Sequence, residues 1–227
     1  MSDSDTKSTC PDIHIGKHFI NKLCQDKEYE ETLKSYTSVA PVYDEYMASA
    51  EHIGAKLTAE TLDNLGLDKE SKIVDIGAGT GALGMLLRER GYKNIDAIDG
   101  SEAMLQVAET RNIYQNYTVA IIVKGKKLAV EDNVYDVAVL CAVFCPGNMG
   151  SDAFSEIIRI VKPGGIIIWA MRAPHLFADV SEHFRNGKFE ADVEELVKKG
   201  KWRHFHMPKT IPYFHGNEGT IFTMQVI

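Results

Sequence analysis

A short apolar segment, Ile73-Val74-Asp75-Ile76, runs directly into glycines at positions 77, 79 and 81, and a helical pattern follows as far as Arg90. This segment constrains the fold more than any other part of the sequence. A strand that ends in closely spaced glycines and enters a helix lets the backbone approach a ligand. In an open α/β sheet such turns lie at the carboxyl ends of the strands. We therefore expect a ligand-binding turn at this position.

The rest of the chain continues the alternation of strands and helices. Strands are predicted at 94–98, 116–123, 135–142 and 166–171, and helices at 102–111, 151–161 and 189–199. Two more strands, at 202–207 and 220–226, have no helix between them. This order predicts an α/β fold with a doubly wound, Rossmann-like, seven-stranded and mostly parallel sheet. Helices should cover both faces, and the sheet should carry an antiparallel C-terminal edge strand.

Three regions are predicted within what we expect to be one domain. Residues 1–10 are rich in Ser, Asp, Thr and Lys and are predicted to form a disordered tail. Residues 11–65 are predicted to form an N-terminal helical cap over the ligand site, with one long helix from about Asp44 to Leu65. Residues 66–227 are predicted to form the α/β core.

The composition disfavours several classes of binding partner and indicates the cellular compartment. The chain has 25 basic and 32 acidic residues and a formal net charge of −7, which disfavours binding to nucleic acid. Its apolar runs are too short to cross a bilayer. The four cysteines form no C-x-x-C pair, which favours free thiols in a reducing compartment. We expect a cytoplasmic monomer without a metal site, nucleic acid or membrane partner, and the nucleus stays open as a second location.

The glycine turn alone is compatible with two cofactors. Gly79-x-Gly81-x-x-Gly84 matches the dinucleotide fingerprint, and Asp99 lies about twenty residues further on. An NAD(P)-dependent oxidoreductase is therefore an alternative. Asp75, two residues before the first glycine, would repel a pyrophosphate, whereas the ammonium and sulfonium groups of S-adenosylmethionine tolerate a carboxylate. A carboxylate at position 99 can accept hydrogen bonds from both hydroxyls of a ribose.

The sequence resembles the class I S-adenosylmethionine-dependent methyltransferases from about residue 36 onward. Five segments carry the resemblance. They are the first glycine motif at 74–81, the second motif at 98–105, the start of the fourth strand at 133–137, the turn before the fifth strand at 160–165, and an upstream Y…AP-x-YD segment at 36–44. The resemblance is strongest to the animal methyltransferase-like proteins of the Williams–Beuren chromosomal region.

This resemblance implies a set of cofactor-binding residues. Backbone atoms of Gly77 and Gly79 should approach the methionine part of the cofactor, and Ala78 and Gly81 of the same turn also belong to its binding site. Asp75 should hold the amino group of the cofactor and Asp99 its ribose, and either Met104 or Gly100 should border the adenine. Tyr36 and Tyr43 should close over the cofactor, and Cys141 should line the site beyond the fourth strand.

One departure from the family pattern concerns the adenine. Many members have Gly-Asp-Ala after the third strand, and that Asp binds the adenine amino group. This chain has Val123-Lys124-Gly125 there, so the acid is absent. A backbone carbonyl near Gly125 is predicted to take its place.

The activity implied is methyl transfer from S-adenosyl-L-methionine by in-line displacement, with S-adenosyl-L-homocysteine as product. We expect a small-molecule acceptor, and a protein substrate stays open. The residues single out no catalytic base. Besides the oxidoreductase, a cofactor-binding scaffold without activity of its own is an alternative.

Overall fold

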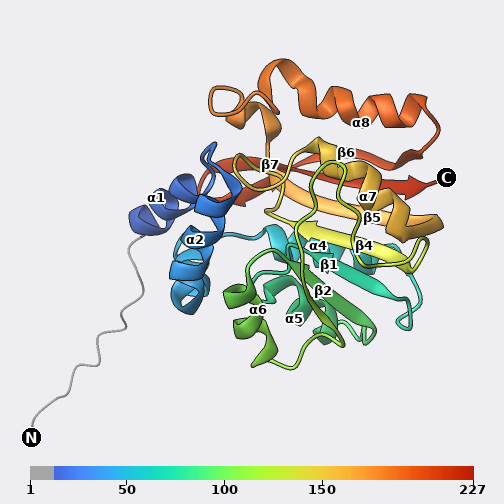
Figure 1. Ribbon diagram of the computed structural model, residues 1–227, viewed down its shortest axis with the longest axis horizontal. Helices are drawn as coiled ribbons and strands as arrows, with labels where there is room; N and C mark the ends of the chain where they lie inside the picture. The colour runs from blue at the N-terminus through green and yellow to red at the C-terminus, as the bar shows by residue number, and fades with distance from the viewer. Residues whose placement is uncertain (1–12) are drawn as a thin grey trace, which may run out of the picture.

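The computed structural model describes residues 13–227, so the predicted tail at 1–10 lies outside the described residues. Seven strands form one sheet in the order β3-β2-β1-β4-β5-β7-β6 (Figure 1). The strands are β1 Ile73–Ile76, β2 Ile95–Asp99, β3 Tyr117–Val119, β4 Tyr135–Cys141, β5 Val161–Arg172, β6 Trp202–Phe214 and β7 Asn217–Val226.

The predicted fold class is confirmed. Strands β1 to β5 pair in parallel, as strands joined by crossover helices do. The C-terminal pair is antiparallel: β7 runs against both β5 and β6. The reversed strand β7 lies one place inside the sheet, and β6 forms the edge itself.

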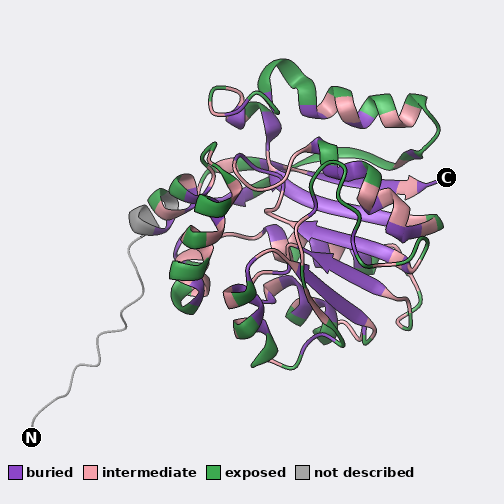
Figure 2. Ribbon diagram, viewed as in Figure 1, coloured by how far each residue is buried: buried purple, intermediate pink, exposed green. Residues whose placement is uncertain are grey.

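Helices cover both faces because the strands alternate their side chains between two separate apolar layers. In β4, Val137 and Val139 join the layer that contains residues of α4, α5 and α6, whereas Ala138 and Leu140 join the layer of α7 and α8. The central strands are buried along their length (Figure 2). The helices are α1 Ile13–Leu23, α2 Tyr29–Val39, α3 Tyr43–Ser49, α4 Gly54–Asn64, α5 Ala82–Glu89, α6 Glu102–Glu109, α7 Phe154–Ile160 and α8 Lys188–Lys198.

An aromatic cluster fills the layer under α7 and α8. Trp169 of β5 stacks on Phe222 of β7, with ring centroids 4.6 Å apart and planes 10° apart. Trp202 at the start of β6 stacks on Trp169 at 5.8 Å and donates a hydrogen bond from Nε1 to the Val193 carbonyl. Both tryptophans of the chain are fully buried. The cluster fastens α8 to the antiparallel side of the sheet.

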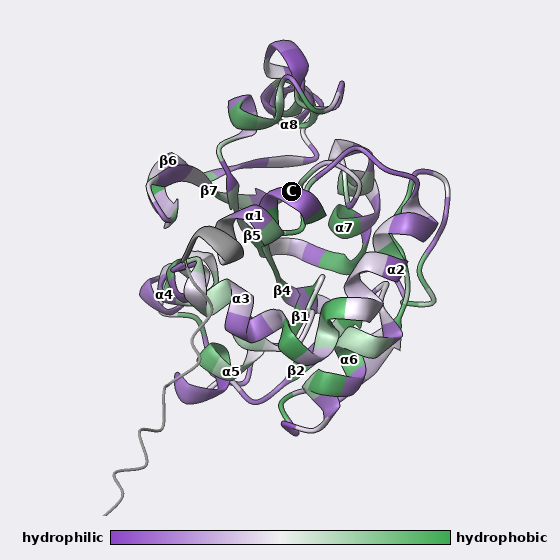
Figure 3. Ribbon diagram, turned by 90° about the vertical axis from the view of Figure 1, so that its left-hand side faces the viewer, coloured by the Kyte–Doolittle hydropathy of each residue, from purple (hydrophilic) through white to green (hydrophobic). Residues whose placement is uncertain are grey.

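Helices α1, α2 and α3 lie around the carboxyl ends of the parallel strands (Figures 1 and 3). The predicted single helix from Asp44 to Leu65 is wrong, because α3 ends at Ser49 and α4 begins at Gly54. Glu51 has a left-handed φ of 53°, and the Ile53 amide donates to the Tyr213 carbonyl at 3.0 Å. This tertiary contact with β6 interrupts the helix, a cause that local sequence does not contain.

Within residues 13–227, we find no helix whose length and apolar character would let it cross a membrane.

Candidate functional site

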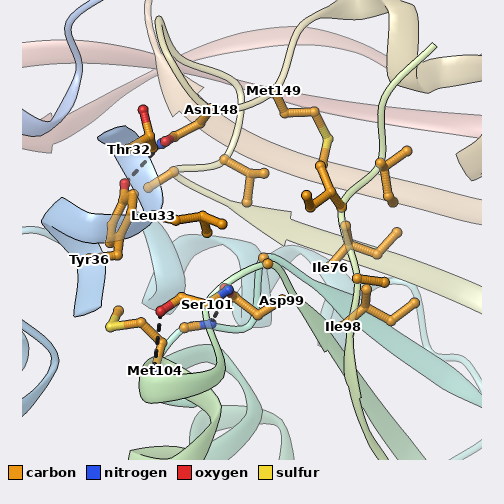
Figure 4. A pocket seen from close by; sticks show the side chains of 18 of the residues that line it. Thr32, Leu33, Tyr36, Ile76, Ile98, Asp99, Ser101, Met104, Asn148 and Met149 are labelled. Carbon is orange, nitrogen blue, oxygen red and sulfur yellow. Dashed lines mark hydrogen bonds between the residues drawn. The ribbon is translucent and has the colours of Figure 1, made fainter. Parts of the chain in front are cut away.

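A cavity with an empty volume of about 720 Å³, its open mouth included, lies at the carboxyl ends of β1, β2 and β4. Figure 4 shows Thr32, Leu33 and Tyr36 of α2 across this cavity from Asp99 and Ser101. We call it the first cavity. The segment after β3 and the loop after β4 complete its walls. The described lining is Tyr29, Thr32, Leu33, Tyr36, Tyr43, Ile76, Gly77, Gly79, Ile98, Asp99, Gly100, Ser101, Met104, Ala120, Ile121, Ile122, Cys141, Ala142, Val143, Asn148 and Met149.

The glycine turn forms one wall, and its conformation requires glycine at two positions. Gly77 has a φ of +69°, and a Cβ there would lie 2.3 Å from Cγ2 of Val143. Gly81 has a φ of +92°, and a Cβ there would lie 2.8 Å from Cδ1 of Ile113. A side chain at either position would therefore meet both backbone strain and a packed neighbour.

Asp99 is tied to the same turn through backbone amides. Its Oδ2 accepts a hydrogen bond from the Gly79 amide at 2.8 Å, and its Oδ1 accepts one from the Ser101 amide at 2.8 Å. Burial raises the pKa of Asp99, and the amides of Ser101, Gly79 and Gly100 oppose that rise. Each carboxylate oxygen keeps a further acceptor position, so the group can still receive hydrogen bonds from a diol.

Asp75 does not line the first cavity. Along β1 the side chains alternate, so Ile76 faces the cavity and Asp75 faces the opposite layer. Tyr114 donates a hydrogen bond to Asp75 at 2.7 Å, and a Cβ on Gly84 would lie 2.4 Å from the Tyr114 hydroxyl. Burial raises the pKa of Asp75 to about 7, although Tyr114 and the Gly84 backbone lower it. Asp75 thus supports the glycine turn from the side opposite to the first cavity.

Two tyrosines stand at the edge of the first cavity. The rings of Tyr36 and Tyr43 lie 6.2 Å apart, and Asn148 donates a hydrogen bond from Nδ2 to the Tyr36 hydroxyl at 2.8 Å. Burial raises the pKa of both phenols well above the usual value, so both stay protonated. Burial also raises the pKa of the Cys141 thiol to about 12, so this cysteine is no thiolate nucleophile.

Asp44 connects the N-terminal helices to the glycine turn. Thr80 donates a hydrogen bond from Oγ1 to Asp44 Oδ1 at 2.6 Å, and Arg111 forms an ion pair with Asp44 Oδ2. We call Asp44, Thr80 and Arg111 the latch. It holds α3, which begins with Tyr43, against the turn and against the segment after α6.

The wall that follows β3 is apolar. Strand β3 ends at Val119, so Ala120, Ile121 and Ile122 take the wall positions. Gly125 lies three residues further along, outside the first cavity, and no atom lies within 4 Å of the place where its Cβ would be. The structure therefore does not bring the predicted adenine contact at Gly125 into this cavity.

A second cavity, with an empty volume of about 430 Å³, adjoins the first and shares Tyr36, Tyr43 and Ala142 with it. Most of its other described lining is apolar or aromatic, with His52, Cys24, Cys145 and Arg172 as the polar members. The apolar members are Ile20, Leu23, Met47, Phe144, Phe177, Tyr213 and Phe214.

The structure gathers eight of the twelve predicted site residues around the first cavity: Tyr36, Tyr43, Gly77, Gly79, Asp99, Gly100, Met104 and Cys141. Asp75, Ala78, Gly81 and Gly125 do not line it. Sequence reasoning missed Tyr29, Thr32 and Leu33. With Tyr36 these residues follow the spacing of one helix face, the signal that would have found them.

Comparisons with known proteins agree with this geometry. A family model described as a methyltransferase domain matches residues 74–169, which include the glycine turn and Asp99. Human Methyltransferase-like protein 27 is 24% identical over 172 residues, or 75% of this chain and 67% of that protein. The ubiquinone/menaquinone biosynthesis C-methyltransferase UbiE of Campylobacter jejuni is 24% identical over 213 residues, or 88% of this chain and 89% of that protein.

The chain is an S-adenosylmethionine-dependent methyltransferase. The fold of this methyltransferase is also that of a solved structure, an S-adenosylmethionine-dependent methyltransferase of Leishmania major. That structure has a TM-score of 0.63 and 14% identity, and the match covers 95% of this chain and 87% of that one.

The first cavity of the methyltransferase fits S-adenosylmethionine. Among the described residues that line it, none is a lysine or an arginine and one is a carboxylate, which suits a cationic ligand better than a pyrophosphate. Gly77 and Gly79 leave their backbone open to the cavity, where a Cβ at Gly77 would collide with Val143.

Proposed function

We propose that this methyltransferase acts on a small molecule that binds in the second cavity. The observation that carries the proposal is the position of that cavity, which meets the first at Tyr36 and Tyr43. Side chains from α1 and α3 close it, among them Leu23 and Met47. A small molecule with an apolar body matches the concave, mostly apolar lining of this cavity better than the surface of a folded protein does. The quinone-biosynthesis relative supports the same class of acceptor.

The first cavity supplies each part of the cofactor with a partner. Backbone at Gly77 and Gly79 meets the methionine part, and the Asp99 carboxylate accepts the ribose hydroxyls. Ile121 and Met104 border the adenine. Asp75, below the turn, positions it through Tyr114 and does not contact the ligand directly.

When bound, S-adenosylmethionine supplies a methyl group on a sulfonium, whose loss leaves a neutral thioether. The chain then has to align the acceptor with that methyl group and keep water out. Tyr36 and Tyr43 do both, because their half-buried side chains form the boundary that the two cavities share. Their phenols and the Cys141 thiol stay protonated, so none of the three is a general base at neutral pH.

Cofactor binding is tested by thermal unfolding with S-adenosylhomocysteine and with NADH. Saturating S-adenosylhomocysteine should raise Tm, because a ligand that binds only the folded state stabilises it. Asp99→Ala should weaken this binding about 10- to 100-fold, since hydrogen bonds to a charged group are lost. Asp132→Asn, at an exposed carboxylate in an ion pair, is the matched control. A shift with NADH and none with S-adenosylhomocysteine would overturn the proposal.

The acceptor class is tested with tritium-labelled methyl groups. We expect label to pass from S-adenosylmethionine into a small-molecule fraction of a cell extract and not into its protein fraction. Label in protein alone would contradict the proposed acceptor. Label in neither fraction, with normal S-adenosylhomocysteine binding, would favour a scaffold without activity.

We also infer a cytoplasmic monomer. Free thiols at Cys24, Cys141 and Cys145 are consistent with a reducing compartment, and a net charge of −7 opposes self-association. Light scattering after gel filtration and cell fractionation test the two statements. A stable dimer or a secreted product would contradict them.

A further inference from the structure

The second cavity contains a cation without a counter-ion. Arg172, the last residue of β5, donates hydrogen bonds to the side-chain oxygens of Asn21 at 3.1 Å and Asn217 at 3.4 Å. Its guanidinium also lies over the rings of Phe177 and Phe214 at 5.4 and 5.6 Å. Within residues 13–227 no carboxylate forms an ion pair with it. Burial lowers the pKa of Arg172, and Cys24 and Cys145 oppose this fall when they are ionised. A hydrogen bond with Cys145 and the charge of Arg172 lower the pKa of the Cys24 thiol.

Two residues that line this cavity each carry a buried nitrogen atom without a hydrogen-bond partner among the described residues. The two atoms are Nε of Arg172 and Nε2 of His52. Buried polar atoms in folded proteins nearly always have a partner, and an unpaired buried charge is costly. Both nitrogens belong to residues that line the same cavity, which adjoins the cofactor site. A ligand in the cavity would supply an acceptor for Nε of Arg172 and a partner for Nε2 of His52, which donates or accepts according to its tautomer.

The charge of the missing group follows from the lining. Arg172 is positive at any physiological pH, whereas burial lowers the pKa of His52 to about 4 and keeps it neutral. The described lining therefore presents one positive charge and no carboxylate. A single negative charge balances it. In any guanidinium the Nε–H lies parallel to one N–H of a terminal nitrogen, and such a pair matches the two oxygens of a carboxylate. In Arg172 the Nε–H is without a partner, and each terminal nitrogen has a second N–H besides the one donated to Asn21 or Asn217.

We propose that the methyl acceptor is an amphipathic organic acid whose carboxylate is bound by Arg172. The inference rests on the proposed function, because it describes the acceptor of the same reaction. The apolar body of the acid packs against Leu23, Met47 and Phe144, and His52 forms a hydrogen bond with a second polar atom. Arg172 is thus a specificity-determining residue at the end of the cavity. A phosphate monoester carries a second negative charge that this lining does not balance.

The test compares acids with their uncharged amides. Phenylacetate and octanoate are titrated against phenylacetamide and octanamide by calorimetry, with and without saturating S-adenosylhomocysteine, and phenyl phosphate is a separate arm. We expect the wild-type protein to bind each acid about 10- to 100-fold more tightly than its amide, as hydrogen bonds to charged groups give. Arg172→Met should reduce this ratio to about one.

Three controls separate recognition from folding. Arg172→Lys keeps the charge and should retain part of the preference for the acid. Arg203→Met removes an exposed arginine of β6, which contacts Gln225, and should leave the ratio unchanged. All three variants should bind S-adenosylhomocysteine as the wild-type protein does, which also shows that they are folded.

Two results would overturn the assignment. One is a wild-type ratio of acid to amide affinity near one; the other is the same ratio in wild type and Arg172→Met. Tighter binding of phenyl phosphate than of phenylacetate would overturn the carboxylate in particular. Failure of the proposed function has a different signature, namely loss of S-adenosylhomocysteine binding or of label transfer, and the acid and amide ratios measured without cofactor do not depend on it.

Discussion

Gly77 shows at the scale of one residue why the turn between β1 and α5 has to be glycine. Its φ of +69° and the contact with Val143 are separate obstacles to any side chain. Gly77→Ala should lower the free energy of unfolding by about 1–3 kcal/mol, the usual cost of such strain, and should abolish measurable S-adenosylhomocysteine binding. Urea denaturation and calorimetry measure the two effects.

Gly125→Ala is the matched control for the backbone term. Gly125 has a φ of +79°, but nothing lies within 4 Å of its Cβ position. This variant should lose unfolding free energy only through backbone strain and should keep its affinity for the cofactor. Equal losses of affinity in both variants would mean that Gly77 does not border the ligand.

Asp75 predicts a pH dependence of stability. Its pKa rises from an ordinary 3.8 to about 7 in the folded state, so between these values the folded protein holds a proton that the unfolded chain releases. The contribution of this proton to the free energy of unfolding is complete below pH 3.8 and is lost as pH rises through about 7. The whole change is on the order of 4 kcal/mol. Asp75→Asn cannot titrate. The stability difference, wild type minus variant, should therefore fall from pH 4.5 to pH 8 in urea denaturation, and parallel pH profiles would refute this.

Individual residues also show what sequence can and cannot predict about the site. Gly77, Gly79 and Asp99 were predictable because a strand, a turn and the next strand fix them at short separations. The direction of the Asp75 side chain was not predictable, because the sequence of β1 does not show which of its two faces is turned toward the cavity. Gly125 was misplaced because β3 is short and the irregular segment after it leaves no periodic signal.

At the scale of elements, the latch determines how α3 meets the core. Asp44→Asn and Arg111→Met each remove one side of the ion pair and should raise the Kd for S-adenosylhomocysteine about 3- to 10-fold, because Tyr43 follows the position of α3. The double variant should be no weaker than the single ones, since both act through one contact. Lys199→Met, which breaks an exposed ion pair with Glu195 on α8, should have no effect. Additive losses in the double variant would contradict the latch.

The break between α3 and α4 illustrates a limit of prediction for elements. The residues from Asp44 to Leu65 contain no proline and keep a helical pattern. The chain leaves the helix because Ile53 pairs with Tyr213, which is distant in sequence. The same break brings His52 to the second cavity, so a feature that sequence failed to predict contributes to the proposed acceptor site.

For the whole molecule, the aromatic cluster under α7 and α8 contributes to stability and lies outside both cavities. The cluster of Trp169, Trp202 and Phe222 is fully buried under α7 and α8, and none of the three lines either cavity. Trp202→Ala should cost about 3–5 kcal/mol of unfolding free energy, as large core truncations do. At 10 °C, where the variant is still folded, its S-adenosylhomocysteine affinity should match that of the wild-type protein. A tenfold weaker affinity of the variant at 10 °C would show that the aromatic cluster also affects the cofactor site.

The order of strands at the C-terminal side has a consequence for synthesis on the ribosome. Strand β7 follows β6 in the chain but lies between β5 and β6 in the sheet. Until residues 217–226 have left the exit tunnel, β5 offers an unpaired edge of apolar residues, and β6 has no neighbour on which to form. Exposed edges of this kind invite pairing with other chains. Nascent chains of this methyltransferase should therefore depend on chaperones until residues 217–226 emerge, and nonsense mutations before residue 217 should yield aggregates.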